Sequence, residues 1–205
     1  MDQTKIAQLV DLLKRHGIKA SFQPTTAEAR QTVFAMAEPG QTVGIGGSQT
    51  IAALELNQAL AEKGCRVLDH NRAPSRDEST AMRHEQLHCD LFLCSTNALT
   101  EKGQLVNVDG VGNRVGAMAF GPKKVVVVAG MNKIVPDLDA AFERIRTVAA
   151  PKNAQRLKRK TPCAEVGRCM DCSSPERMCS VFTIIERRPS LTDLEVIVVG
   201  EELGY

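Results

Sequence analysis

Four of the seven cysteines in this chain lie close together near its C-terminal end, where their thiolates can share one metal centre. They are Cys163, Cys169, Cys172 and Cys179, with the spacing C-x₅-C-x₂-C-x₆-C. Structural zinc and a four-iron, four-sulfur (4Fe–4S) cluster both accept four thiolates. The single Cys-x-x-Cys pair and the uneven outer spacings favour the larger cluster. The run differs from the C-x₂-C-x₂-C-x₃-C pattern of ferredoxins, so structural zinc stays open as the alternative.

A glycine-rich turn at residues 43–50, with the sequence VGIGGSQT, has the composition of an anion-binding site. Gly46 and Gly47 let the backbone approach a ligand closely, and Ser48 and Thr50 add hydroxyl donors. Such a turn suits a phosphate, a carboxylate or the pyrophosphate of a nucleotide. It lacks the G-x-G-x-x-G pattern and the Walker lysine. A tight turn capped by Ser48 explains the same residues and stays open as the simpler reading.

Eight polar residues from position 95 to position 133 fall at the expected ends of strands. They are Ser95, Thr96, Asn97, Thr100, Glu101, Asp109, Asn113 and Lys133. A carboxylate just after a buried strand, as at Glu101, can serve as a base or nucleophile, although the spacing alone favours a solvated loop residue. Asp109 and Asn113 flank glycines, where Asp and Asn are ordinary turn residues.

The remaining cysteines and two histidines have simpler explanations. Cys65, Cys89 and Cys94 adjoin apolar segments, which indicates buried thiols. His84 and His88 are four residues apart on an expected helix and could chelate a metal, but no third ligand is evident. We expect them to lie at the surface or at a helix end.

The segments that carry these residues alternate between strand-like and helix-like patterns, which predicts an α/β fold with a mostly parallel sheet flanked by helices. After the cysteine-rich loop, two further strands are expected. The expected strands cover residues 19–22, 42–45, 66–68, 91–94, 105–108, 115–119, 124–129, 181–186 and 195–199. The expected helices cover residues 4–16, 27–37, a segment after Ser48 that includes 52–60, 75–88 and 138–149, with resumption after Pro151 to about Lys160.

Composition limits the class of protein. The chain of 205 residues is long enough for one domain over 1–205, with the cysteine-rich segment 163–179 inside it. A net charge of +2 and an aromatic content of 3% argue against nucleic-acid binding. No apolar run approaches the roughly 18 residues of a membrane span, and no signal peptide is evident, so we expect a cytoplasmic protein. In that reducing compartment, clustered thiols indicate metal binding rather than disulfides.

The long run STNALTEKGQLVNVDGVGNRVGAMAFGPKKVVVVAGMNKIV strongly resembles the LUD (lactate-utilisation) family, and GIGGSQT and VVGEELGY match its glycine turn and its short, cysteine-bearing branch. The resemblance covers nearly the whole chain. It implies a fold similar to ribose-phosphate isomerases, glucosamine-phosphate deaminases and CoA transferases, with the active site at the carboxyl ends of the parallel strands. By resemblance, the glycine turn holds an anionic group. Four other residues would face the same crevice: Asn97, Glu101, Asp109 and Asn113.

The resemblance also implies a function, because members of this family accompany iron–sulfur proteins in lactate oxidation. We therefore expect an iron–sulfur subunit of a lactate-type 2-hydroxyacid oxidation system, with a small anionic metabolite as ligand and iron–sulfur or flavin proteins as redox partners. Glu101, Asp109 and Asn97 are the candidate catalytic residues. The alternatives are an isomerase or CoA-transferase-like enzyme that uses Glu101, and a zinc-stapled ligand-binding or scaffold protein. The candidate ligand-binding residues are Gly46, Gly47, Ser48, Thr50, Asn113 and Lys133.

Overall fold

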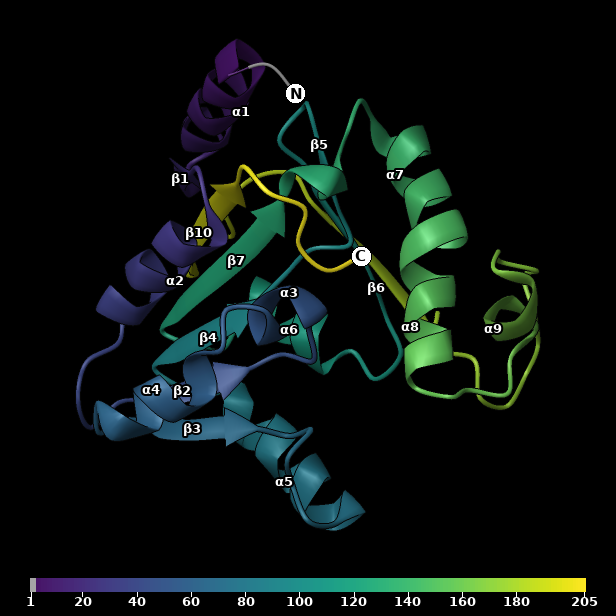
Figure 1. The fold of residues 1–205 in the computed structure, drawn as a ribbon, viewed down its shortest axis with the longest axis horizontal. Helices are drawn as coiled ribbons and strands as arrows, with labels where there is room; N and C mark the ends of the chain where they lie inside the picture. Colours follow the sequence, from purple (N-terminus) through teal and green to yellow (C-terminus); the bar gives the residue numbers. More distant parts are fainter. Residues whose placement is uncertain (1–2) are drawn as a thin grey trace.

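The computed structural model describes residues 3–205, which form two β-sheets with helices packed around them (Figure 1). The strands are β1 (Lys19–Gln23), β2 (Thr42–Ile45), β3 (Arg66–Asp69), β4 (Leu91–Cys94), β5 (Ala98–Thr100), β6 (Leu105–Asp109), β7 (Lys124–Gly130), β8 (Ile134–Val135), β9 (Val181–Ile185) and β10 (Asp193–Val199). The larger sheet has six parallel strands in the order β1-β10-β7-β4-β2-β3. The prediction of an α/β fold with a mostly parallel sheet flanked by helices is confirmed.

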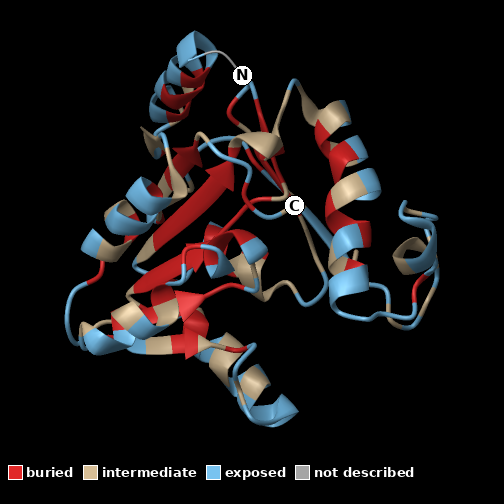
Figure 2. Ribbon diagram, viewed as in Figure 1, coloured by how far each residue is buried: buried red, intermediate tan, exposed pale blue. Residues whose placement is uncertain are grey.

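The helices lie on both faces of the larger sheet and beside the smaller one. They are α1 (Gln3–Arg15), α2 (Thr26–Ala35), α3 (Gln49–Ala52), α4 (Leu56–Glu62), α5 (Arg76–Gln86), α6 (Asn113–Ala119), α7 (Leu138–Arg144), α8 (Ala150–Arg156) and α9 (Pro162–Val166). Apolar residues of α1 and α6 pack on one face of the larger sheet, and those of α2, α3 and α4 pack on the other. The central strands are therefore buried on both faces, as Figure 2 shows in red.

The predictions of individual elements are most accurate where burial is most complete. Strands β2 and β4 have the predicted bounds, and all four residues of β4 are buried. The apolar stripe of the first helix, Ile6, Leu9, Val10 and Leu13, is buried against the larger sheet as expected. The Asp137 side chain caps the first turn of α7, also as predicted.

The prediction of a strand at residues 115–119 is wrong, because this segment belongs to helix α6. Gly112, with φ of 90°, starts the helix in a backbone conformation that glycine adopts without strain. Short apolar runs do not distinguish a buried helix from a buried strand, and Val115, Ala117 and Met118 are all buried here. The carboxyl end of β6 therefore leads into a helix.

Two helical predictions need correction. The helix expected after Ser48 is broken into α3 and α4, with Glu55 between them in the left-handed conformation. The helix expected to pause at Pro151 does not pause, because α7 and α8 are joined by a π-helical turn at Ile145–Ala149 into the long green helix of Figure 1. Pro151 lies in the first turn of α8.

The smaller sheet has the order β8-β5-β6-β9 and was not expected as a separate sheet. Strand β9 pairs antiparallel with β6, whereas β10 lies between β1 and β7 in the larger sheet. The two strands predicted after the cysteines are thus both present, and each joins a different sheet. The cysteine-rich segment, with α9 inside it, connects α8 to β9. In residues 3–205, no helix has the length and apolar character to cross a membrane.

Candidate functional site

The carboxyl ends of three neighbouring strands, β2, β4 and β7, lie beside a cavity of about 250 Å³. The glycine turn follows β2 and supplies Gly47 and Ser48 to its wall. Asn97 comes from the segment after β4, and Lys133 from the short 3₁₀ turn after β7. Ligands of open α/β folds commonly bind at such strand ends, so the fold and the cavity point to the same site.

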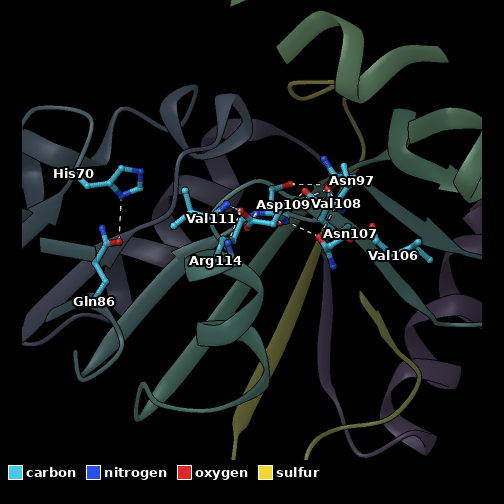
Figure 3. Close-up of polar contacts among 12 residues, drawn as sticks. His70, Gln86, Asn97, Val106, Asn107, Val108, Asp109, Val111 and Arg114 are labelled. Atoms are coloured by element: carbon cyan, nitrogen blue, oxygen red, sulfur yellow. Dashed lines mark hydrogen bonds and ion pairs between the residues drawn. The ribbon is translucent and has the colours of Figure 1, made fainter. Parts of the chain in front are cut away.

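Arg114, on the first turn of α6, connects the polar residues on one wall of this cavity (Figure 3). Its guanidinium donates to Asn97 Oδ1 at 3.0 Å and Asn107 Oδ1 at 2.6 Å, and to two backbone carbonyls. Its Nε lies 3.5 Å from the Asp109 carboxylate, so this acid is already paired. The sequence analysis missed Arg114, because residues 115–119 were expected to form a strand rather than a helix that turns this side chain toward the site.

Lys133 is a buried amine on the cavity wall, with a side chain only 3% exposed. Its Nζ donates to Ser95 Oγ at 3.0 Å and to the Thr96 carbonyl at 3.2 Å. Burial, together with the charges of Arg144 and Arg114, lowers the pKa of Lys133 to about 7. A lysine that titrates near neutral pH in a polar cavity is typical of a functional site.

His70, directly after β3, presents a basic nitrogen to the cavity and was missed by the sequence analysis. The Gln86 amide nitrogen donates to two backbone carbonyls at 2.9 and 2.7 Å, which leaves its oxygen to accept from His70 Nδ1 at 3.1 Å (Figure 3). The ring therefore carries its proton on Nδ1 and keeps a lone pair on Nε2. Burial, and then the Arg83 charge, lower the pKa of His70 and favour the neutral ring. Gly47 lies beside this nitrogen, because a Cβ placed on Gly47 would be 3.5 Å from His70 Nε2.

The lining of the cavity is strongly cationic. Five basic side chains line it, Arg83, Arg114, Lys133, Arg156 and Arg159, against one acid that is paired with an arginine. Positive charge without a nearby acid attracts small anions into a partly closed cavity. Dissolved salt screens this attraction and makes it weaker.

The structure brings together most, but not all, of the predicted ligand-binding residues. Asn97, Asp109, Asn113 and Lys133 line the same cavity as Gly47 and Ser48. Gly46 lies on the other side of the turn, where its amide donates to a carbonyl of β4 and its Cα lines a neighbouring groove.

Thr50 and Glu101 lie outside this cavity. Thr50 is completely buried, and its hydroxyl donates to the Leu203 carbonyl at 3.1 Å, so it holds the C-terminal segment rather than facing a ligand. Glu101 is exposed in the turn after β5, where its backbone amide donates to Val135. The strand before Glu101 belongs to the smaller sheet, which separates this carboxylate from the carboxyl ends of β2, β4 and β7. The expectation that Glu101 faces the crevice is therefore wrong.

The four clustered cysteines line a second, smaller cavity of about 20 Å³. Burial raises the pKa of Cys179, and negative charge on Cys169, Cys163 and Cys172 raises it further, so these three sulfurs lie within electrostatic reach of Cys179. A backbone amide donates to Cys169 Sγ at 3.4 Å, and the Thr161 hydroxyl is 3.3 Å from Cys163 Sγ. As placed, no three His, Cys, Asp or Glu side chains of residues 3–205 have the geometry of a metal site.

Three residues, Ala150, Met178 and Cys179, line both cavities. The backbone of Met178 lies within 3.3 Å of the position where a Cβ on Gly110 would sit. The thiol cluster and the cationic cavity, which are far apart in sequence, therefore share a wall.

The remaining cysteines are buried, as predicted. Burial raises the pKa of Cys89 to about 11 and that of Cys94 to about 12, and it also raises the pKa of Cys65. Thiols with raised pKa values are poor nucleophiles and poor metal ligands at neutral pH. The four cysteines of the segment 163–179 are, by contrast, partly exposed.

A model of the LUD domain family matches residues 6–199 of this chain. Among solved structures, a DUF162 family protein from Deinococcus radiodurans is similar in fold, with a TM-score of 0.54, 17% identity and coverage of 96% of both chains. Ribose 5-phosphate isomerase A from Neisseria gonorrhoeae matches with a TM-score of 0.34 and 15% identity, over 55% of this chain and 54% of its own. The beta subunit of eIF2B from Chaetomium thermophilum matches at 0.38 and 14%, over 66% and 48%. No curated protein matches the sequence.

Proposed function

Because the chain belongs to the LUD domain family, related to lactate utilisation, we propose that it is an iron–sulfur subunit of a lactate-type 2-hydroxyacid oxidation system. It would bind the carboxylate of a small hydroxy acid in the cationic cavity and hold a 4Fe–4S cluster on the four cysteines. The observation that carries the proposal is the shared wall at Cys179, since electron transfer is fastest between sites that lie close together.

The chemistry of the cavity fits a small carboxylate. Arg156 and Arg159 supply positive charge, and the Ser48 hydroxyl and the Asn113 side chain supply polar groups to the lining. His70 offers Nε2 as an acceptor for the hydroxyl proton of such a ligand, because Gln86 holds the ring proton on Nδ1. Binding, orientation and proton acceptance are thus available from residues of this chain alone.

The donor set of the second cavity fits an iron–sulfur cluster, which would supply one-electron transfer when bound. The four thiols are gathered, and an amide and a hydroxyl lie within hydrogen-bond distance of two sulfurs, a contact that tunes cluster potentials. The Arg177 guanidinium donates to the carbonyls of Cys172 and Cys179 and pairs with the Asp171 carboxylate at 3.0 Å, so it ties the segment around the thiols together. The space of about 20 Å³ is small, so the thiols have to rotate outward to admit a cluster.

The proposed reaction needs a partner. Oxidation of a 2-hydroxy acid to a 2-oxo acid removes two electrons and two protons, whereas a 4Fe–4S cluster carries one electron at a time. The electrons therefore pass to a flavin or a further iron–sulfur protein, which we propose as the partner of this chain in the cytoplasm.

Metal and sulfide analysis tests the cluster. Protein purified without oxygen should be brown, with iron and acid-labile sulfide in near-equal amounts. Cys179→Ser should lose most of the iron, whereas Cys65→Ser, which changes a buried thiol outside the cluster, should retain it. A colourless protein that holds stoichiometric zinc would instead support a zinc-stapled binding protein and refute the redox role.

Calorimetric titration tests the anion site separately. Lactate should bind, and lactamide, which has the same shape without the charge, should bind at least tenfold more weakly. Affinity for lactate should also fall as salt is raised. Equal affinity for the two compounds would show that the cavity does not select anions.

A further inference from the structure

The Lys133 amine has a hydrogen-bond arrangement that suits nucleophilic attack. The Ser95 hydroxyl donates to the Thr96 carbonyl at 3.3 Å, so its oxygen is left to accept from Lys133. A neutral amine has two N–H donors and one lone pair. Ser95 Oγ and the Thr96 carbonyl take both donors, and the lone pair stays available on the cavity side.

The charges around Lys133 keep a large share of the amine neutral. Arg144 donates to the backbone carbonyls of Asn132 and Asn97 and has no described carboxylate partner, so its charge acts on the lysine in full. Arg114 adds a second positive charge, and Cys94, whose raised pKa keeps it protonated, adds none at neutral pH. Desolvation beside other cations is one of the recognised ways to activate a lysine nucleophile.

We propose that Lys133 forms a covalent imine with a 2-oxo acid bound in the cationic cavity. The amine nitrogen attacks the ketone carbon, both of its protons pass to the former carbonyl oxygen, and that oxygen leaves as water as the C=N bond forms. No oxidant or reductant is consumed. The choice of a 2-oxo acid rests on the proposed function, because oxidation of a 2-hydroxy acid yields one, and its carboxylate matches the basic lining.

Reductive trapping tests the imine. The intact protein is incubated with pyruvate and cyanoborohydride, which delivers hydride to the imine carbon and leaves a stable secondary amine. Peptide mass spectrometry should find Lys133 heavier by one pyruvic acid less one oxygen, at a yield at least tenfold above that of any exposed lysine. Lactate, which has no ketone, should reduce this labelling by competition.

Two variants control the experiment. Lys133→Met removes the amine and cannot form the imine, so labelling of that peptide should be lost while circular dichroism stays unchanged. Lys102→Arg removes an exposed lysine and should leave labelling of Lys133 as it was. Uniform labelling of exposed lysines with Lys133 unmodified would overturn the proposal. Equal labelling of Lys133 by acetone would overturn its assignment to 2-oxo acids. Iron and sulfide analysis of the same preparation reports on the redox proposal independently.

Discussion

At the scale of single residues, burial of the Lys133 amine costs folding free energy. Its pKa of about 7 in the folded protein lies well below the ordinary value of 10.5, so the unfolded chain binds more protons between these two values. Stability contributed by the neutral amine is fully present above pH 10.5 and is lost as the pH falls toward 7.

We therefore predict that the wild-type protein gains stability relative to Lys133→Met as the pH rises from 7 to 9, by up to about 1.4 kcal/mol per pH unit. At pH 7 the variant should be the more stable protein. Urea unfolding of both proteins at pH 7, 8 and 9 measures the difference, and other titrating groups cancel in it. A pH-independent difference would mean that the amine keeps its ordinary pKa.

The second residue-scale prediction concerns His70 and Gln86. In the wild-type protein, nitrogen NMR should find His70 as the Nδ1–H tautomer, with a pKa below its ordinary value because of burial and Arg83. Gln86→Met removes the acceptor, so the Nε2–H tautomer should appear. Unfolding should become easier by about 1–3 kcal/mol, because two buried carbonyls lose their donor. His84, which lies on the same helix as Gln86, serves as an internal reference for the NMR measurement.

Residue-scale prediction from sequence worked where a residue follows a strand directly. Asn97 and Lys133 were found because strand ends of a parallel sheet converge on one edge. His70 and Arg114 were missed, since their importance depends on long-range partners, an amide on α5 and an aspartate on β6. Glu101 was misplaced because nothing in the local pattern showed that β5 leaves the larger sheet.

At the scale of elements, the C-terminal segment 200–205 closes over the glycine turn and holds the cavity wall. The Leu203 carbonyl accepts from the Thr50 hydroxyl, and the Leu203 amide donates to Asn132 at 3.1 Å. The Tyr205 hydroxyl, which lines the cavity, accepts from Arg156 at 2.7 Å. The VVGEELGY motif thus positions the site although it contributes only one side chain to it.

Gly204→Ala should disrupt this element. Gly204 has φ of +60°, and a Cβ there would lie 2.6 Å from Thr50 Oγ1 and 2.9 Å from its amide nitrogen. We expect a loss of more than about 2 kcal/mol in unfolding free energy and weaker lactate binding, since the backbone conformation alone costs about 1–2 kcal/mol. Gly40→Ala is the matched control, with φ of +83° and nothing within 4 Å. It should show only the conformational cost and normal binding, and equal effects of the two changes would contradict the packing argument.

The accuracy of element prediction followed burial. Strand β7, with four consecutive valines, and the amphipathic helix α1 were predicted because their patterns are long and consistent. Helix α6 and the short strands β5 and β8 were not, because their form depends on what they pack against. The π-helical turn that carries the helix past Pro151 has no sequence signal that periodicity can detect.

At the scale of the whole molecule, the cysteine-rich segment lies outside the main hydrophobic core. Among its residues, only Cys179 packs against a hydrophobic cluster, whereas the larger sheet is sandwiched between two clusters of its own. The segment is anchored at both ends, by α8 and by β9, and it has little regular structure after α9.

Removal of the proposed cluster should therefore loosen this segment and leave the sheets intact. After chelation under oxygen, circular dichroism should change little, while trypsin should cleave faster after Arg168 and Arg177 than in the cluster-bound protein. Cleavage after Arg15 or Arg72, outside the segment, should keep its rate and serves as the control. Global unfolding on metal loss would show instead that the cluster supports the whole fold.

With the proposed cluster bound, the shared wall at Cys179 would let the two sites change each other's binding free energies, and any such coupling is reciprocal. If a bound carboxylate makes the cluster harder to reduce, then reduction must weaken carboxylate binding by the same factor. Each carboxylate ligand, the hydroxy acid or its oxidised product, would then bind more weakly when the cluster is reduced than when it is oxidised. Release of product would in this way be timed by the arrival of an electron on the cluster, with no moving lid.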